Sequence, residues 1–171
     1  MEGSVNLSRR AFLRAQPVVR TALRPPWAVV EEAFVNLCSR CDECLSVCPN
    51  GIVVRGDGAY PTINFLQGEC TFCGACADQC RTGALQRGDP HNVRPWSYRV
   101  QIVEACLAQR NVVCRTCGDV CEAGAIRFQP RLGGAAVPVV DYSLCSGCGA
   151  CVSPCPTHAI AMTNHQEGAM Q

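Results

Sequence analysis

Apolar residues in this chain fall in short runs separated by polar and turn-forming residues. Runs rich in β-branched or small apolar residues occupy positions 52–54, 137–140 and 159–161. Runs of this length bounded by turn residues are typical of short strands, here of compact βαβ units. Three-residue stretches such as Ala77-Asp78-Gln79 suit one or two helical turns. The pattern therefore predicts an α+β fold made of small elements.

Two segments lack this pattern and suggest domain boundaries. Residues 86–95 are rich in Gly, Pro, Asp and Asn, which is typical of a linker. Residues 1–28 are basic and interrupted by three prolines, so we expect an irregular arm outside any core. The predicted organisation is a basic N-terminal arm over 1–28, one module over 29–88 and a second module over 96–165.

No apolar run approaches the roughly 18 residues that a membrane span requires. Residues 8–14 read Ser-Arg-Arg-Ala-Phe-Leu-Arg, which has the look of a twin-arginine export signal. Residues 15–30, however, contain two arginines and three prolines where such a signal needs an apolar segment. The sequence therefore predicts a cytoplasmic protein without a membrane span.

The sixteen cysteines dominate the chemistry of the chain. Three groups share the spacing C-x2-C-x2-C-x3-C, and the third group has seven residues between its first two cysteines. The groups are Cys38, Cys41, Cys44 and Cys48; Cys70, Cys73, Cys76 and Cys80; Cys106, Cys114, Cys117 and Cys121; and Cys145, Cys148, Cys151 and Cys155.

The repeat extends beyond the cysteines. Cys-Gly-Ala-Cys at 73–76 recurs at 148–151, and an Arg-Pro-Trp signal precedes the first and third groups, at 24–27 and 94–96. Recurrence at this period indicates modules that come in pairs, groups one and two followed by groups three and four.

The regular spacing is typical of bacterial ferredoxins, in which the fourth cysteine ligates the cluster held by the other group. A zinc site usually takes two C-x2-C pairs separated by a longer loop, and a disulfide scaffold is rare in the cytosol. We therefore predict two tandem bacterial-type 2[4Fe-4S] ferredoxin-like modules. The expected sites are Cys38, Cys41, Cys44 and Cys80; Cys70, Cys73, Cys76 and Cys48; Cys106, Cys114, Cys117 and Cys155; and Cys145, Cys148, Cys151 and Cys121.

The number of 4Fe-4S clusters is expected to be three to four, with four favoured. The stretched third group leaves a three-iron or empty site open as an alternative. Pro follows the fourth cysteine in groups one and four but is replaced by Arg81 and Glu122 in groups two and three, which alters hydrogen bonding near those cysteines.

Composition and charge narrow the function. The formal net charge of +1 gives no argument for nucleic acid. Because each cluster carries four thiolates, four dicationic clusters would bring the formal charge to about −7. The chain has no Gly-rich nucleotide loop and no Ser/His/Asp constellation, so we expect it not to be an enzyme.

The remaining candidates are histidines and aromatic residues. His158 follows a ligand group but is expected to be a loop residue because cysteines already supply every site. His91 and His165 are expected to be solvated, and Tyr60, Phe72 and Tyr142, which flank ligand groups, are expected to shield the clusters from water.

The chain resembles the NapF family of ferredoxin-type proteins of bacterial periplasmic nitrate reductase systems. The resemblance rests on the order of the four cysteine groups, with the third irregular, behind the Ser-Arg-Arg-x-Phe-Leu-Arg start and the Arg-Pro-Pro-Trp segment. The resemblance implies a cytoplasmic accessory protein that acts in maturation of the catalytic subunit NapA, with the precursor of NapA as partner before its export. The alternative from the residues alone is a general soluble poly-4Fe-4S electron carrier between a dehydrogenase and a reductase, for which the basic arm would be dispensable.

Overall fold

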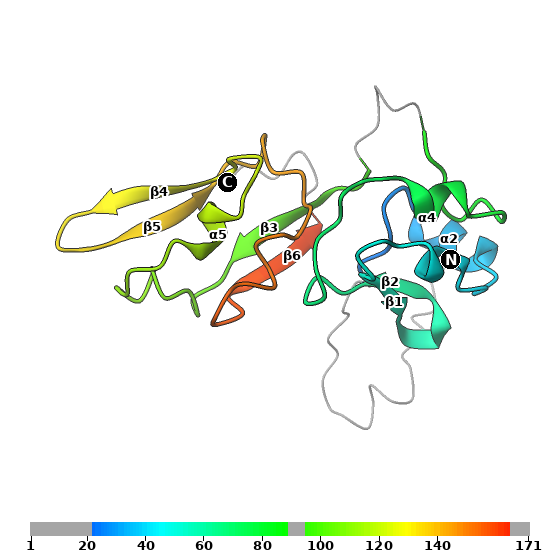
Figure 1. Ribbon diagram of the computed structural model, residues 1–171, viewed down its shortest axis with the longest axis horizontal. Coiled ribbons are helices and arrows are strands. Elements are labelled where there is room, and N and C mark those ends of the chain that lie inside the picture. Colours follow the sequence, from blue (N-terminus) through cyan, green and yellow to red (C-terminus); the bar gives the residue numbers. More distant parts are fainter. Residues whose placement is uncertain (1–21, 89–94, 165–171) are drawn as a thin grey trace, which may run out of the picture.

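The first module surrounds its cysteines with short elements. The computed structural model describes residues 22–88 and 95–164 (Figure 1). The elements of the first module are α2 (Glu31–Leu37), α3 (Glu43–Ser46), β1 (Val53–Arg55), the 3-10 turn η1 (Asp57–Ala59), β2 (Pro61–Ile63) and α4 (Ala75–Asp78).

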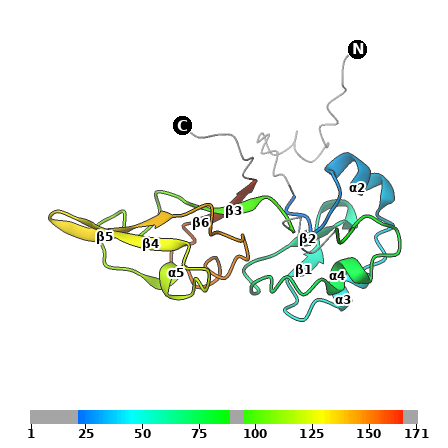
Figure 2. The ribbon, with the colours of Figure 1, turned by 90° about the horizontal axis from the view of Figure 1, so that it is seen from above.

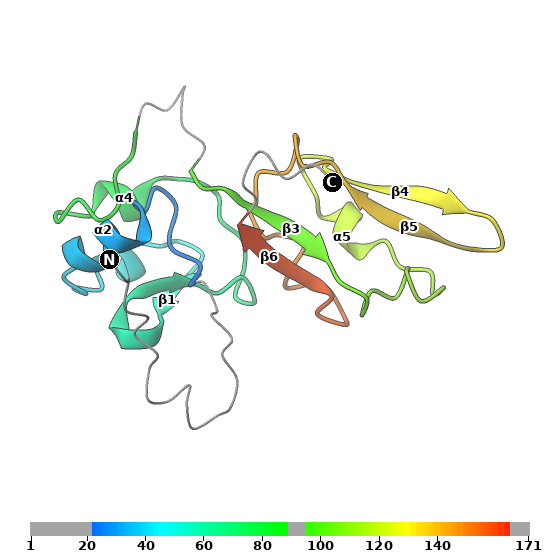
Figure 3. The same ribbon diagram turned by 180° about the vertical axis from the view of Figure 1, so that it is seen from behind.

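The second module has a similar plan with longer strands. Its elements are β3 (Tyr98–Ile102), α5 (Thr116–Asp119), β4 (Ile126–Arg131), β5 (Gly134–Val140) and β6 (Ile160–Asn164). The first strand of the module, β3, pairs with the last, β6, while β4 and β5 form a hairpin that projects away from the rest of the molecule (Figures 1 and 3). In the first module a single bridge between Ala28 and Leu85 takes the place of the β3–β6 pair.

The strand pairing differs from the sequence-based expectation. Strands form at the expected places, with β1, β5 and β6 overlapping the three apolar runs. Every strand pair in the described residues is antiparallel, however, so the expected βαβ units are wrong. The cause is the length of the connections, since β1–β2 and β4–β5 follow one another through short turns that permit only hairpins.

The cysteines are part of the core. One buried cluster contains Cys145 and Cys151 together with Val100 and Ile126, and another contains Cys76 with Phe34 and Leu85. Phe34 is 0% exposed and also lines a cavity with Cys38. Because each module has few large apolar side chains, contacts around the cysteines supply much of its packing.

Residues 22–28, which we expected in an arm outside either core, are packed against the first module. Pro25 and Pro26 are among the largest fully buried side chains, and the backbone N–H of Val29 donates to the carbonyl of Ala84. Arg24 Nε donates to Glu31 at 2.9 Å, and its guanidinium lies 4.7 Å from the centre of the Phe34 ring. The prolines and Trp27 thus end the arm earlier than expected, and the rest of the predicted arm lies outside the described residues.

The two modules share a core cluster. Ile52, Val53, Ile63 and Phe65 of the first module are packed with Trp96, Val152 and Met162 of the second. Figure 2 shows the first module beside β3 and β6, with the β4–β5 hairpin on their far side. The pair of modules is therefore joined by buried side chains as well as by the chain itself.

Phe34 provides a test of the first core. We expect Phe34→Ala to lower the free energy of unfolding by about 3–5 kcal/mol, because it removes a fully buried ring. Urea unfolding of anaerobically prepared protein, followed by ellipticity, would measure this change. Leu132→Ala at the fully exposed hairpin tip is the control, with an expected change within about 0.5 kcal/mol. Equal effects of the two substitutions would contradict the core assignment.

Candidate 4Fe-4S centres

Four cavities are each lined by four cysteines. The first is lined by Cys38, Cys41, Cys44 and Cys80; the second by Cys48, Cys70, Cys73 and Cys76; the third by Cys106, Cys114, Cys117 and Cys155; and the fourth by Cys121, Cys145, Cys148 and Cys151. Every cysteine of the chain lines one cavity, and none is shared. These four sets coincide with the four predicted sites.

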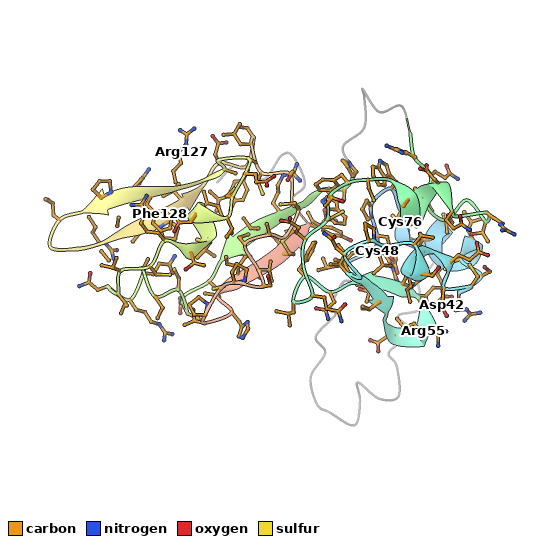
Figure 4. The ribbon with its side chains drawn as sticks, viewed as in Figure 1. Asp42, Cys48, Arg55, Cys76, Arg127 and Phe128 are labelled. Carbon is orange, nitrogen blue, oxygen red and sulfur yellow. The ribbon has the colours of Figure 1, made fainter. Side chains whose placement is uncertain are left out.

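Each cavity takes three cysteines from one group and the last from the paired group. Cys48 and Cys76, both labelled in Figure 4, lie inside the first module and line the second cavity although they belong to different groups. The contact between α3 and α4 brings the two groups of this module together, because each helix ends beside the fourth cysteine of its group. The arrangement links the halves of each module through its cysteines.

Left-handed residues flank the second cysteine in each regular group. The φ angles of Arg40 and Asp42 are 59° and 64° in group one, and Phe72 and Gly74 have 54° and 86° in group two. In group four the flanking residues are Gly147 and Gly149. Alternation of left- and right-handed residues points successive N–H groups into a concavity that suits an anionic group. This turn explains why two residues separate the cysteines.

The third group is built differently. Neither residue beside Cys114 has a positive φ angle, and the longer loop before it has one at Asn111. The Asn111 side chain accepts a hydrogen bond from the N–H of Ala135 at 2.8 Å, which fastens the loop to β5. Leu107 from the same loop lines the third cavity with Phe128 and Pro138 of the hairpin. The hairpin thus supports a site whose local turn is irregular.

Several of the lining cysteines are partly buried among other thiols and apolar groups. Burial, reinforced by neighbouring cysteines, raises the pKa of Cys44, Cys76 and Cys151 to about 12. Burial likewise raises the pKa of Cys70 and Cys117 to about 11. A metal that binds these sulfurs must therefore displace protons, and it would meet a donor set made entirely of sulfur.

This geometry suits a cluster better than a single ion. A zinc site needs its sulfurs within about 2.3 Å of one point. In residues 22–88 and 95–164, no group of three or more His, Cys, Asp or Glu side chains is placed to hold a single ion. A 4Fe-4S cluster instead spreads its four iron atoms, one for each cysteine sulfur. The sixteen cysteines, all in the described part, form no disulfide.

Two of the fourth cysteines receive backbone hydrogen bonds on sulfur. The N–H of Leu85 donates to Cys80 Sγ at 3.4 Å, and that of Ala159 donates to Cys155 Sγ at 3.3 Å. Although burial acts to raise the pKa of Cys80, the hydrogen bonds from Leu85 and Thr82 hold it below its usual value. Such bonds stabilise thiolate and influence cluster potential.

The other predicted residues have mixed outcomes. Phe72 lines the second cavity, as expected of a residue that shields a cluster. Tyr60 instead packs against Phe34, and Tyr142 is 41% exposed and lines none of the four cavities. His158 lies in a loop and also lines none of them, whereas His91 and His165 lie outside the described residues.

Sequence reasoning missed some neighbours of the sites. Trp27 and Pro26, assigned to the arm, line the second cavity. Their placement in an Arg-Pro-Trp repeat beside the first cysteine group was the available signal. Asp42 and Arg55 form an ion pair that spans the first module between its first cysteine group and β1 (Figure 4).

Comparison with protein families agrees with this geometry. Residues 37–85 and residues 112–167 each match a family described as a 4Fe-4S dicluster domain. The chain therefore contains two 4Fe-4S ferredoxin modules in tandem, as predicted. The second match begins after Cys106, so this cysteine is placed at the third cavity by the fold alone.

Curated relatives extend over nearly the whole chain. Ferredoxin-type protein NapF of Haemophilus influenzae is 44% identical over 170 residues, covering 93% of this chain and 95% of the relative. The chain belongs to the NapF family of ferredoxin-type proteins. NapF of Escherichia coli K12 is 42% identical, and the alignment covers 91% of this chain and 94% of that NapF sequence. Methylamine utilization ferredoxin-type protein MauM of Methylobacillus flagellatus is 32% identical, and the alignment covers 85% of this chain and 69% of MauM.

Membership in the NapF family makes the chain an iron-sulfur electron-transfer protein. The relatives are ferredoxin-type proteins, which points to an electron carrier or accessory protein rather than a catalyst. None of the helices in the described part is long and apolar enough to span a bilayer.

Shared ligation can be tested at Cys48. We expect Cys48→Ala to damage the cluster held by Cys70, Cys73 and Cys76, because Cys48 lines their cavity. Mössbauer and electron paramagnetic resonance (EPR) spectra would show which cluster changes, with Cys80→Ala as the matched variant for the first site. Loss of the cluster at Cys38, Cys41 and Cys44 on Cys48→Ala would instead mean that each group closes its own site.

Iron content tests the third cavity. Anaerobically reconstituted protein should bind about sixteen iron atoms if all four cavities hold a complete 4Fe-4S cluster. Cys106→Ala should then lower the content by up to about four atoms. A wild-type value near twelve, unchanged by Cys106→Ala, would remove the third site, and zinc in place of iron would overturn the assignment.

Proposed function

We propose that this NapF-family protein is a cytoplasmic iron-sulfur protein that assists maturation of the catalytic subunit, NapA, of a periplasmic nitrate reductase before its export. In this proposal the sixteen cysteines hold four 4Fe-4S clusters, one in each cavity. Each 4Fe-4S cluster supplies one-electron redox chemistry when bound. The chain's own residues line the four sites, and the backbone donates hydrogen bonds to the sulfurs of Cys80 and Cys155.

The observation that carries the proposal is the extent of similarity to NapF proteins. At 44% identity the alignment covers more of the chain than the two modules together contain. A generic match of cysteine motifs would stop at the modules. The twin-arginine-like start and the irregular third group, which carry the family resemblance, are consistent with this function.

The N-terminal segment is the proposed partner contact. Within residues 1–21, four arginines face one glutamate, which gives a formal charge of +3. Arg24 is excluded from this count because it is paired with Glu31. Four bound clusters would make the rest of the protein strongly negative, so this segment would be the basic region available to an acidic partner.

A general electron carrier is the second candidate. It is favoured by the similarity to MauM, a protein named for methylamine utilization, over 85% of the chain. A sequence similar to most of this chain thus occurs in a protein named for a different process. For a general carrier, the basic N-terminal segment would be dispensable.

An affinity pull-down from cytoplasm separates the two candidates. Full-length protein should capture the nitrate reductase precursor, and a chain lacking residues 1–21 should capture markedly less. The deletion ends at 21 because residues 22–28 are packed in the first module. Arg9→Gln with Arg10→Gln should weaken capture most at low salt, where electrostatic attraction is least screened.

The matched control removes the same charge elsewhere. Arg127→Gln with Arg131→Gln changes two arginines on the β4–β5 hairpin and should leave capture unchanged. Iron content should be the same in all variants. Capture that is insensitive to the deletion would support the general carrier, and recovery of a shortened chain from the periplasm would show that the twin-arginine motif is a working signal.

A further inference from the structure

The two modules meet where a cysteine of the second site faces a cysteine of the fourth site. The backbone N–H of Cys70 donates to the carbonyl oxygen of Cys148 at 2.8 Å. This hydrogen bond joins residues 78 positions apart that line different cavities. It creates a short covalent and hydrogen-bonded route from one sulfur, through both backbones, to the other sulfur.

A cluster of aromatic residues lies at the same contact between the modules. Trp96 lies 5.8 Å from Phe65 and 5.4 Å from Phe72, in edge-to-face geometry with each ring. Its indole N–H donates to the carbonyl of Ser146 at 3.2 Å, within the fourth cysteine group. Trp96 therefore contacts both modules, at Phe72 and Ser146, each two residues from one of the two hydrogen-bonded cysteines.

Gly149, a residue of the second module, leaves space for the Phe65 ring of this aromatic cluster. Gly149 has a φ angle of 81°, and a Cβ built at this position would overlap the Phe65 ring. Gly74 occupies the same place in the matching Cys-Gly-Ala-Cys motif with a φ angle of 86°, but the atoms nearest to a Cβ built there belong to the Arg87 guanidinium of the first module. The two glycines share a motif and a conformation, and Gly149 alone of the two accommodates the junction.

Residues 22–28 add contacts to the same junction. The N–H of Arg24 donates to the hydroxyl of Tyr98 at 3.0 Å, and the N–H of Trp27 donates to the carbonyl of Pro95 at 2.7 Å. Leu23 is packed against the shared core cluster. The junction is thus buried, hydrogen-bonded and aromatic, rather than a loose tether between independent domains.

We propose that Phe65, Trp96 and Gly149 are positioning residues that hold the second and fourth cluster sites side by side, so that one electron passes between the modules through the Cys70–Cys148 contact. Within each module the cores place sites one and two together, and sites three and four together. The order along the molecule is therefore one, two, four, three, which differs from the order of the cysteine groups in the sequence.

The electron transfer needs no further reactant. With clusters bound, one site would give up one electron and the other would take it up, while no covalent bond of the chain changes and no proton moves. The inference rests on the proposed occupation of all four sites and is independent of the partner. Iron content and the pull-down separate a failure of those assignments from a failure of the junction.

Magnetic coupling between the two sites tests the proposal directly. A full-length chain with Cys41→Ala and Cys114→Ala loses one ligand at sites one and three and keeps every ligand of sites two and four. With about eight iron atoms bound and both clusters reduced, it should show an EPR signal split by dipolar coupling, which falls with the cube of distance. An unsplit signal would overturn the proposal.

Aromatic substitutions then locate the cause of the coupling. Adding Phe65→Ala, which removes the ring packed against Trp96, should strongly reduce the splitting at unchanged iron content, whereas Tyr60→Ala, the matched variant packed against Phe34 within the first module, should retain it. Retention of the full splitting in Phe65→Ala would contradict the role of the junction.

A second pair of variants, in the otherwise wild-type holoprotein, guards against poor folding of the altered chains. Trp96→Ala should narrow the spectrum of the fully reduced protein and increase its largest dimension in small-angle scattering. Tyr142→Ala, an aromatic change near group four but outside the junction, should leave both unchanged. Identical spectra and dimensions for the two variants, with full iron, would again overturn the proposal.

Discussion

The shared four-cysteine site is the constraint on which this structure depends. Each site closes only when the fourth cysteine of the paired group reaches it, so two stretches of chain must fold together before either site is complete. Burial raises the pKa of several of these thiols, which opposes their ionisation until a metal binds. The free energy of metal binding is then also folding free energy. The thin apolar core of each module is consistent with this dependence.

The cysteine pattern predicted which cysteines lie together around each cavity, because ligand spacing reflects the geometry of the metal group more directly than apolar periodicity reflects packing. All four cysteine sets in the structure coincide with the expected ones, including the exchange of Cys48 and Cys80. Strand direction was predicted less well, since short apolar runs do not distinguish hairpins from parallel units. The antiparallel pairing follows from turn lengths that the apolar pattern did not reveal.

The two Arg-Pro-Trp signals show that a sequence repeat does not predict the surroundings of its residues. Both signals mark the start of a pair of modules in the sequence, yet their tryptophans have different environments. Trp27 lines the second cavity, whereas Trp96 lies between the modules. Contacts between modules join residues far apart in the sequence, such as Cys70 and Cys148, and no local pattern encodes them. Gly149 was visible in the motif, but its motif partner Gly74 has no such role, so only the fold distinguishes them.

The most direct measurement of the central claim is the crystal structure of anaerobically prepared holoprotein, with iron located by anomalous scattering at its absorption edge. The account predicts four 4Fe-4S clusters, each bound by three cysteines of one group and the last cysteine of the paired group. It also predicts that the clusters at Cys70 and Cys148 face each other across the module junction. Clusters bound by four cysteines of a single group, or a third cavity without iron, would contradict it.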